Sequence, residues 1–294
     1  MKARYITLPE NWDELTPEDW RELLRMREAM IRRGKQVTIE DVRIETARML
    51  LQNRGVKLQL NNRQYLVLVS QLADGLDWLW QADDNGISLV YRTADNKLPR
   101  VRDWYGPMPY AADMTFGEFR MAVAILRNYE QEPSERALNM LAGLLYRPRL
   151  NAVVKTIRRI GNKEYIARKD YDFDDFEAKE QRGAKMQRWQ VWGIYAWFAY
   201  FCEYLASGVF VLEGEEISFA PLFQKPDGGG TAKKEGGGSS LAQICHTLAE
   251  THVFGTAREV DRTLLFDVMQ KLLQDFYSLQ RIKKTKIRYD HNNS

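Results

Sequence analysis

The side chains that could bind a metal ion are few and poorly spaced. The chain of 294 residues has three histidines, and two of them, His246 and His252, are six residues apart. Ligands on one face of a helix are three or four residues apart, so this pair does not fit a helical metal site. The acidic run DYDFDD at 170–175 resembles the opening of a calcium loop, but Asp175 stands where the turn glycine belongs and Gln181 where the bidentate glutamate belongs. The sequence therefore predicts no metal site.

Phosphate-binding loops and activated nucleophiles are not indicated either. Two glycine clusters, 228–230 and 236–238, flank residues 231–234, but the spacing is not that of a GxxxxGK[ST] loop. The composition of this stretch is typical of a flexible linker. Neither cysteine, Cys202 or Cys245, stands in a setting typical of a catalytic thiol, and no serine lies in a nucleophile elbow. We therefore expect reduced cysteines, no enzymatic activity and no cofactor.

Two basic clusters could contact phosphate groups. One contains Arg158 and Arg159, and the other contains Lys283 and Lys284. The whole chain has 43 basic and 40 acidic residues, so its net charge of +3 produces no strong overall field, and any binding to nucleic acid would be local. Each cluster also has the size expected of a solvated face. A nucleic-acid-binding accessory protein is therefore the alternative function, and nucleic acid is the less favoured partner.

The most apolar stretch of the chain is 191–212, whose only charged residue is Glu203. Its apolar residues fall on every face of a helix, and such a helix must be buried. Its 22 residues could span a bilayer, but the central Glu203 and the spread of aromatic residues along the run favour a buried core or interface helix, with no membrane insertion. The residues expected to contact a protein partner come from this helix and the segment after it: Trp189, Trp192, Trp197, Phe219 and Phe223.

Local sequence signals predict where the helices begin. Thr16 followed by Pro17 and Asp19 is a helix start, and Thr38 is a second N-cap. Three Ser/Thr–Glu/Gln pairs predict capping boxes: Thr115 with Glu118, Ser240 with Gln243, and Thr256 with Glu259.

Other elements follow from periodicity and turn residues. A helix is predicted over 62–80, with a hairpin across residues 61–62 as the alternative, and a strand is predicted over 87–91. Residues 105–109 are expected to form a loop, 134–146 a helix, and 261–282 the last helix.

These elements predict a mainly α protein, bundle-like, with two helical parts and a small β or irregular insertion near 85–110. The predicted organisation has five segments: an N-terminal helical domain (1–150), a charged connector (151–185), the aromatic helix with an extended segment (186–224), a flexible glycine-rich linker (225–240) and a C-terminal helical part (241–294).

Three short stretches together resemble a known group of proteins. They are LPENWDELT at 8–16, FAPLF at 219–223 and HVFGT at 252–256. They are similar to proteins encoded among the tail-assembly genes of tailed phages and prophages of Bacteroidetes, and the similarity covers the two ends and the middle of the chain. This resemblance implies a helical assembly chaperone or a minor structural component that works through protein contacts, and it supplies no catalytic residues.

The expected function is therefore that of a non-enzymatic protein-binding or assembly factor of a phage-like system. Its partner would be another protein or a second copy of the chain. The N-terminus leads into polar sequence without the apolar segment of a secretion signal. The expected location is the cytoplasm of a bacterial host, with the virion as the second option.

Overall fold

The computed structural model describes residues 7–33, 37–57, 62–83, 86–150, 168–172, 175–223 and 253–292, with only the backbone for 283–292. Most of these residues are helical and the strands are short, which confirms the predicted mainly α fold with a small β insertion. Several predicted features lie outside the described residues: the linker 225–240, the capping box of Ser240 with Gln243, Cys245, His246, His252, Arg158 and Arg159.

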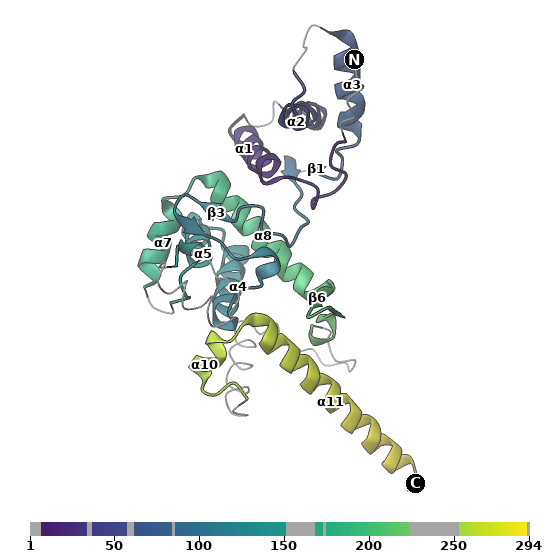
Figure 1. Cartoon of the computed structure of the whole chain (residues 1–294), viewed down its shortest axis with the longest axis vertical. Coiled ribbons are helices and arrows are strands. Elements are labelled where there is room, and N and C mark those ends of the chain that lie inside the picture. Colours follow the sequence, from purple (N-terminus) through teal and green to yellow (C-terminus); the bar gives the residue numbers. More distant parts are fainter. Residues whose placement is uncertain are drawn as a thin grey trace.

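The N-terminal group consists of three helices and one hairpin (Figure 1): α1 (Pro17–Arg33), α2 (Ile39–Asn53), α3 (Arg63–Asp74), β1 (Trp80–Asp83) and β2 (Gly86–Leu89). The predicted N-caps are confirmed, since the Thr16 and Thr38 hydroxyl oxygens accept hydrogen bonds from the Asp19 and Asp41 backbone N–H groups. Each aspartate in turn accepts a hydrogen bond from the backbone N–H of its threonine, which completes a reciprocal cap.

The helix predicted over 62–80 is shorter than expected. Asn62 caps its start as the helix interpretation requires, but α3 ends at Asp74 and is followed by Gly75. Trp80 instead opens β1, where it pairs with Leu89, and its indole N–H donates to the Thr46 hydroxyl at 2.9 Å. The strand predicted over 87–91 is present as β2, but it begins at Gly86 and ends at Leu89. The spacing of apolar residues past Gly75 is that of a helix. The chain instead forms a strand at Trp80, because Trp80 pairs with Leu89 of β2.

The central group contains the longest buried helix of the described chain. Its elements are β3 (Arg100–Val101), β4 (Trp104–Tyr105), η2 (Pro109–Ala111), α4 (Phe116–Gln131), α5 (Glu135–Leu145), β5 (Arg147–Pro148), α7 (Phe176–Ala184) and α8 (Arg188–Ser207). Strands β3, β4 and β5 form a small antiparallel sheet, so Tyr105 belongs to a strand and not to the predicted loop. Helices α5 and α7 cross so closely that a Cβ atom on Gly143 would lie 1.7 Å from the Lys179 carbonyl oxygen.

The C-terminal group follows α8. It comprises β6 (Phe210–Leu212), β7 (Glu215–Ile217), η3 (Ala220–Leu222), α10 (Ala257–Arg262) and α11 (Leu265–Asn292). The capping box of Thr256 with Glu259 is confirmed and begins α10. The single helix predicted over 261–282 is wrong in its bounds, because the chain is extended at Thr263 and Leu264 and α11 continues for ten residues past Ile282.

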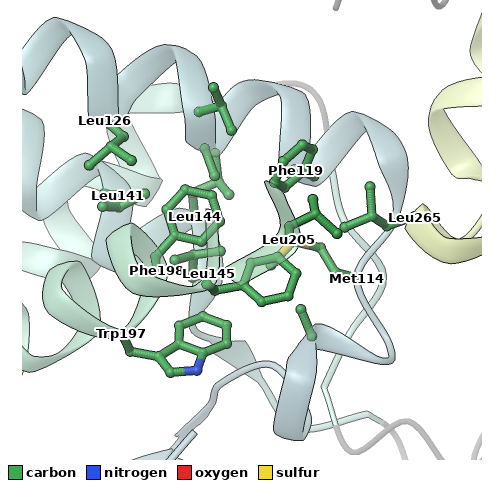
Figure 2. Close-up of a cluster of buried hydrophobic side chains, with 14 of the residues drawn as sticks. Met114, Phe119, Leu126, Leu141, Leu144, Leu145, Trp197, Phe198, Leu205 and Leu265 are labelled. Atoms are coloured by element: carbon green, nitrogen blue, oxygen red, sulfur yellow. The ribbon is translucent and has the colours of Figure 1, made fainter. Parts of the chain in front are cut away.

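The hydrophobic core has two clusters, and α8 belongs to both. The first cluster is built from α1, α2, α3 and the β1–β2 hairpin, and it includes Trp189. The second is built from α4, α5 and α8 and reaches into α11; Figure 2 shows Trp197, Phe198 and Leu205 of α8 within it. The two clusters of described residues do not follow the five segments predicted from the sequence. Those segment boundaries stay a prediction.

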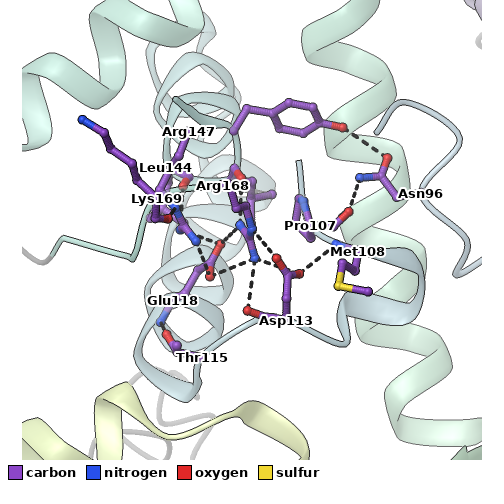
Figure 3. A network of polar contacts seen from close by, with 12 residues as sticks. Asn96, Pro107, Met108, Asp113, Thr115, Glu118, Leu144, Arg147, Arg168 and Lys169 are labelled. Carbon is purple, nitrogen blue, oxygen red and sulfur yellow. Dashed lines mark hydrogen bonds and ion pairs between the residues drawn. The ribbon is translucent and has the colours of Figure 1, made fainter. Parts of the chain in front are cut away.

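A buried ionic network lies beside the second cluster (Figure 3). The Arg168 guanidinium contacts the carboxylates of Asp113 and Glu118, and Arg147 contacts Glu118 at 2.9 Å. Burial alone would lower the pKa of Arg168, but the two carboxylates raise it above its usual value. This network corrects the capping box predicted at Thr115: the threonine accepts from the Glu118 N–H, but the Glu118 side chain turns to the two arginines.

Among the described residues, no helix combines the length and the apolarity that crossing a membrane requires. In the same part of the chain, no three His, Cys, Asp or Glu side chains gather where they could hold a metal ion. Asp175, from the acidic run, caps the start of α7 by accepting from the Ala178 N–H at 3.0 Å.

Candidate functional site

The far half of α11 exposes several large apolar side chains. The contacts that hold the near end of this helix determine where that exposed half begins. The Phe116 N–H donates to the Thr263 carbonyl at 2.9 Å, and the Leu265 N–H donates to the Met114 carbonyl at 2.9 Å. These two backbone hydrogen bonds fix the start of α11 against the start of α4. An ion pair between Arg120 of α4 and Asp261 of α10, at 2.7 Å, holds the preceding helix on the same side.

Aromatic packing completes this attachment. Leu265 and Val268 are fully buried, and Phe266 lies 5.0 Å from Phe210 and 6.0 Å from Phe219, measured between ring centroids. Phe219 therefore holds the base of α11 in place. The conformation of the helix base follows from contacts with α4, β6 and the segment before η3, all far away in the sequence.

Beyond this base, α11 projects away from the rest of the described chain (Figure 1). Tyr277 is 46% exposed, Leu279 59% and Ile282 63%. Leu279 lies seven residues after Leu272 and fourteen after the buried Leu265, so the three leucines share one face of the helix. We call Leu272, Leu279 and Ile282 the distal stripe. The distal stripe is the outward continuation of a face that the protein itself buries at the base.

The sequence around the distal stripe is strongly basic. Residues 281–288 contain five lysines and arginines and no acidic residue. Arg281 is exposed, whereas the side chains of Lys283 and Lys284 lie outside the described atoms. The far half of α11 therefore combines exposed apolar side chains with positive charge, a pattern typical of helices that dock onto acidic surfaces.

One carboxylate lies near the base of this helix. Burial raises the pKa of Asp267, and the neighbouring carboxylate of Glu213 raises it further. Glu213 stands in the turn between β6 and β7 with a φ of 53°, and Gly214 follows with a φ of 86°. The sharp turn thus brings a second negative charge toward α11.

The aromatic residues predicted to contact a partner have mixed positions. Trp197 and Phe219 are fully buried by the chain itself, and the Trp197 indole N–H donates to the Ala94 carbonyl at 3.0 Å. Trp189 is also buried in the core. A side chain covered by its own chain offers no area to a partner, so these three residues are corrected to core positions. The prediction of partner binding keeps only Trp192 and Phe223 from that set.

Trp192 and Phe223 differ in their surroundings. Trp192 is half-buried because the Arg27 guanidinium of α1 lies 3.6 Å from the centre of its ring. Burial lowers the pKa of Arg27 to about 10, which keeps the guanidinium charged at neutral pH. Phe223, by contrast, is 48% exposed at the end of the described segment after η3. Of the predicted set, Phe223 alone presents a large free apolar surface.

Sequence reasoning missed the residues that the structure exposes on α11. The notable ones are Tyr277, Leu279 and Ile282. A signal was present, because Leu265, Leu272 and Leu279 recur at the seven-residue spacing of a helix that packs on another helix. The spacing predicts a shared face, but only the structure separates its buried half from its exposed half.

Comparisons with known proteins give no relative for this chain. No family model, no curated protein and no solved structure matches it. The resemblance to phage tail-assembly proteins is therefore not tested by these comparisons.

Proposed function

We propose that the protein is a non-enzymatic assembly factor that binds a protein partner through the far half of α11. The observation that carries this proposal is the distal stripe, in which Leu279 and Ile282 are exposed on a face whose near end is core. Soluble proteins bury such a face or use it for binding, because isolated apolar area in water is unfavourable. A helix presenting apolar residues at spacings of three and seven fits an apolar groove or a second helix.

The charge around the distal stripe selects the kind of partner. Five positive charges within 281–288 favour an apolar groove rimmed by aspartate and glutamate. A second copy of α11 packed in parallel would place these charges side by side, and like charges repel. The proposed partner is therefore a different protein with an acidic helix-binding groove.

The resemblance of 8–16, 219–223 and 252–256 to tail-assembly proteins supports a place for this function in a phage-like system. In that setting the protein is a tail assembly chaperone or a minor structural component. It would act in the cytoplasm of the bacterial host, and a structural component would also be present in the virion.

A site-specific crosslinking experiment tests the proposal. A photoreactive phenylalanine analogue is placed at Leu279, and in a separate matched control at Leu66 of α3, which is exposed to 39%. After irradiation in the host cell, we expect one discrete adduct at position 279 that is absent at position 66, with the crosslinked peptide lying in an acidic helical region of another protein.

The same experiment includes outcomes that contradict the proposal. Identical adducts at positions 66 and 279 would mean non-specific apolar contact, and an adduct with a second copy of the chain would replace the heterologous partner by self-association. Loss of the specific adduct on Ile282→Gln, with no change on Leu68→Gln in α3, is the expected confirmation that the distal stripe makes the contact.

The alternative function, nucleic-acid binding, uses Arg158, Arg159, Lys283 and Lys284. Its support is the position of Lys283 and Lys284 in the projecting helix α11. Phosphate contacts produce a steep salt dependence. DNA or RNA retardation at low salt that survives alanine at all four positions would contradict this alternative.

A further inference from the structure

A second site lies between the start of α1 and the turn that joins β3 to β4. It is a pocket of about 350 Å³. Its lining residues are Pro17, Arg21, Lys97, Leu98, Pro99, Arg100 and Arg102. Four of these seven carry a positive charge and none is acidic. Three of these cations pair with a carboxylate of the chain: Arg21 with Glu18, Lys97 with Asp95, and Arg100 with Asp103. The fourth, Arg102, has no such partner in the described part of the chain and is available to an anion.

Lys97 and Arg21 are held in place by their own chain. Lys97 is only 9% exposed, and its Nζ atom lies 2.8 Å from an Asp95 carboxylate oxygen and 3.1 Å from the Asp13 carbonyl oxygen. The Nε–H of Arg21 donates to the Pro17 carbonyl at 3.2 Å, and its Nη2 atom pairs with the Glu18 carboxylate. These contacts fix two cations at the wall of the pocket before any ligand arrives.

The turn at Arg102 supplies a second, independent observation. Arg102 is the first of the two residues that connect β3 to β4, and its φ is 52°. Glycine is the residue preferred where a two-residue hairpin turn needs a positive φ, because a Cβ atom makes that conformation unfavourable. Strained backbone of this kind is concentrated at binding and catalytic sites.

Arg102 lines the pocket. Within the described part of the chain, its exposed guanidinium has no hydrogen-bond or ion-pair partner. Arg100, two residues earlier, donates a hydrogen bond from its Nε–H to the Arg102 carbonyl at 2.6 Å and lies 5.4 Å from the centre of the Tyr105 ring. It also forms an ion pair with Asp103 at 3.5 Å. One unpaired arginine thus stands beside three cations that carboxylates of the chain hold in position.

We infer that this pocket binds the phosphate or diphosphate group of a small molecule. The planar guanidinium forms paired hydrogen bonds to phosphate oxygens, and a phosphate carries enough charge to engage several cations at once. A nucleic-acid strand is the less suitable ligand, since it needs cations spaced along a groove, whereas these four line a single pocket. The inference does not depend on the binding function proposed for α11.

The substitution Arg102→Gly separates binding from folding. It removes the free charge and at the same time gives the turn the residue that its positive φ favours. We expect an unchanged or higher melting temperature together with binding of pyrophosphate weakened about tenfold or more. Isothermal titration with sodium pyrophosphate, against sodium chloride of equal ionic strength, measures the affinity.

Matched controls decide between the outcomes. Arg63→Gln removes an exposed arginine from α3 outside the pocket and should leave the affinity unchanged. Absence of binding heat in the wild-type protein, or equal affinity in Arg102→Gly, would overturn the inference. A single-stranded oligonucleotide that binds more tightly than pyrophosphate and loses affinity in Arg102→Gly would overturn the assignment to a small molecule.

Discussion

Helices α8 and α11 are the two longest helices of the described chain, with 20 and 28 residues, and the protein treats them in opposite ways. α8 lies between the two hydrophobic clusters and contributes side chains to both of them. α11 is buried at its base, where Leu265 and Val268 have no exposed surface, and then leaves the body. One helix is enclosed along its length, whereas the other is enclosed only at one end.

The apolar content of a helix therefore indicates how much of its surface must be covered, but it does not indicate whether the chain itself or a partner covers it. The aromatic rings of α8 pack mostly on each other and on the chain's own helices; Trp197 and Phe201 are stacked with ring centroids 5.9 Å apart. The less apolar α11 is the helix with uncovered leucine and isoleucine. The surface that we propose for a partner is therefore the part of α11 whose apolar face continues beyond the core.

The largest expected effect comes from removing a side chain in the middle of α8. Trp197→Ala should lower the free energy of unfolding by about 3–5 kcal/mol, because it leaves a cavity in a closely packed cluster. Urea unfolding followed by circular dichroism measures the change. Tyr277→Ala on α11 is the control and should cost far less, since that ring is 46% exposed. Equal losses in the two variants would remove the contrast between the helices.

The contact between α8 and α1 can be tested by adding atoms instead of removing them. A Cβ atom at Gly193 would lie 2.5 Å from Leu24 Cδ1 and 3.1 Å from Leu98 Cδ1. Gly193→Ala should therefore lower the free energy of unfolding by about 1–3 kcal/mol, as overpacking does. Gly75→Ala is the matched control, because its new Cβ meets nothing closer than 3.6 Å, and it should be neutral or stabilising. A neutral Gly193→Ala would show that α1 and α8 are separated more widely in solution.

These contrasts also show what the sequence could and could not predict. Helix starts at Thr16 and Thr38 were predictable because the capping bonds join residues three apart. The ion pairs of the Glu118 side chain were not predictable, because its two arginine partners lie 29 and 50 residues later in the sequence. Local bonds are visible in the sequence, whereas buried ion pairs depend on which distant elements meet.

The same reasoning applies to the candidate site. The seven-residue spacing of Leu265, Leu272 and Leu279 indicates a common face, so the helix and its apolar side were within reach of sequence analysis. The point at which this face of α11 becomes exposed depends on α4 and Phe219, because they contact only the base of the helix. The partner surface was therefore predicted in the long apolar run of α8, at residues such as Trp197 that the chain itself buries.

A smaller effect is expected from the far half of α11. The double substitution Leu279→Gln with Ile282→Gln should change the free energy of unfolding by less than about 0.5 kcal/mol, because both side chains are exposed and glutamine suits a helix. Thermal unfolding monitored by circular dichroism measures it. A loss comparable to that of Trp197→Ala would mean that the distal stripe is covered within the protein, which would end its role as a binding face.

The smallest effect on stability is expected from the carboxylate of Asp267 at the base of α11. The middle of α8 has no such charged residue. Because the pKa of Asp267 is raised in the folded protein, its protonation favours the folded state, so stability should rise as the pH falls from 7 through that pKa toward the unfolded value of 3.8. Asp267 is only partly buried, so solvent and salt screen its charge and limit the gain to below about 0.5 kcal/mol. Asp267→Asn should raise stability slightly at pH 7 and flatten this part of the pH profile, and Glu213→Gln should do so only in part. If Asp267→Asn left the slope of unfolding free energy against pH unchanged, the raised pKa of Asp267 would be contradicted. The base of α11 would then be more open to water than its packing at Phe266 indicates.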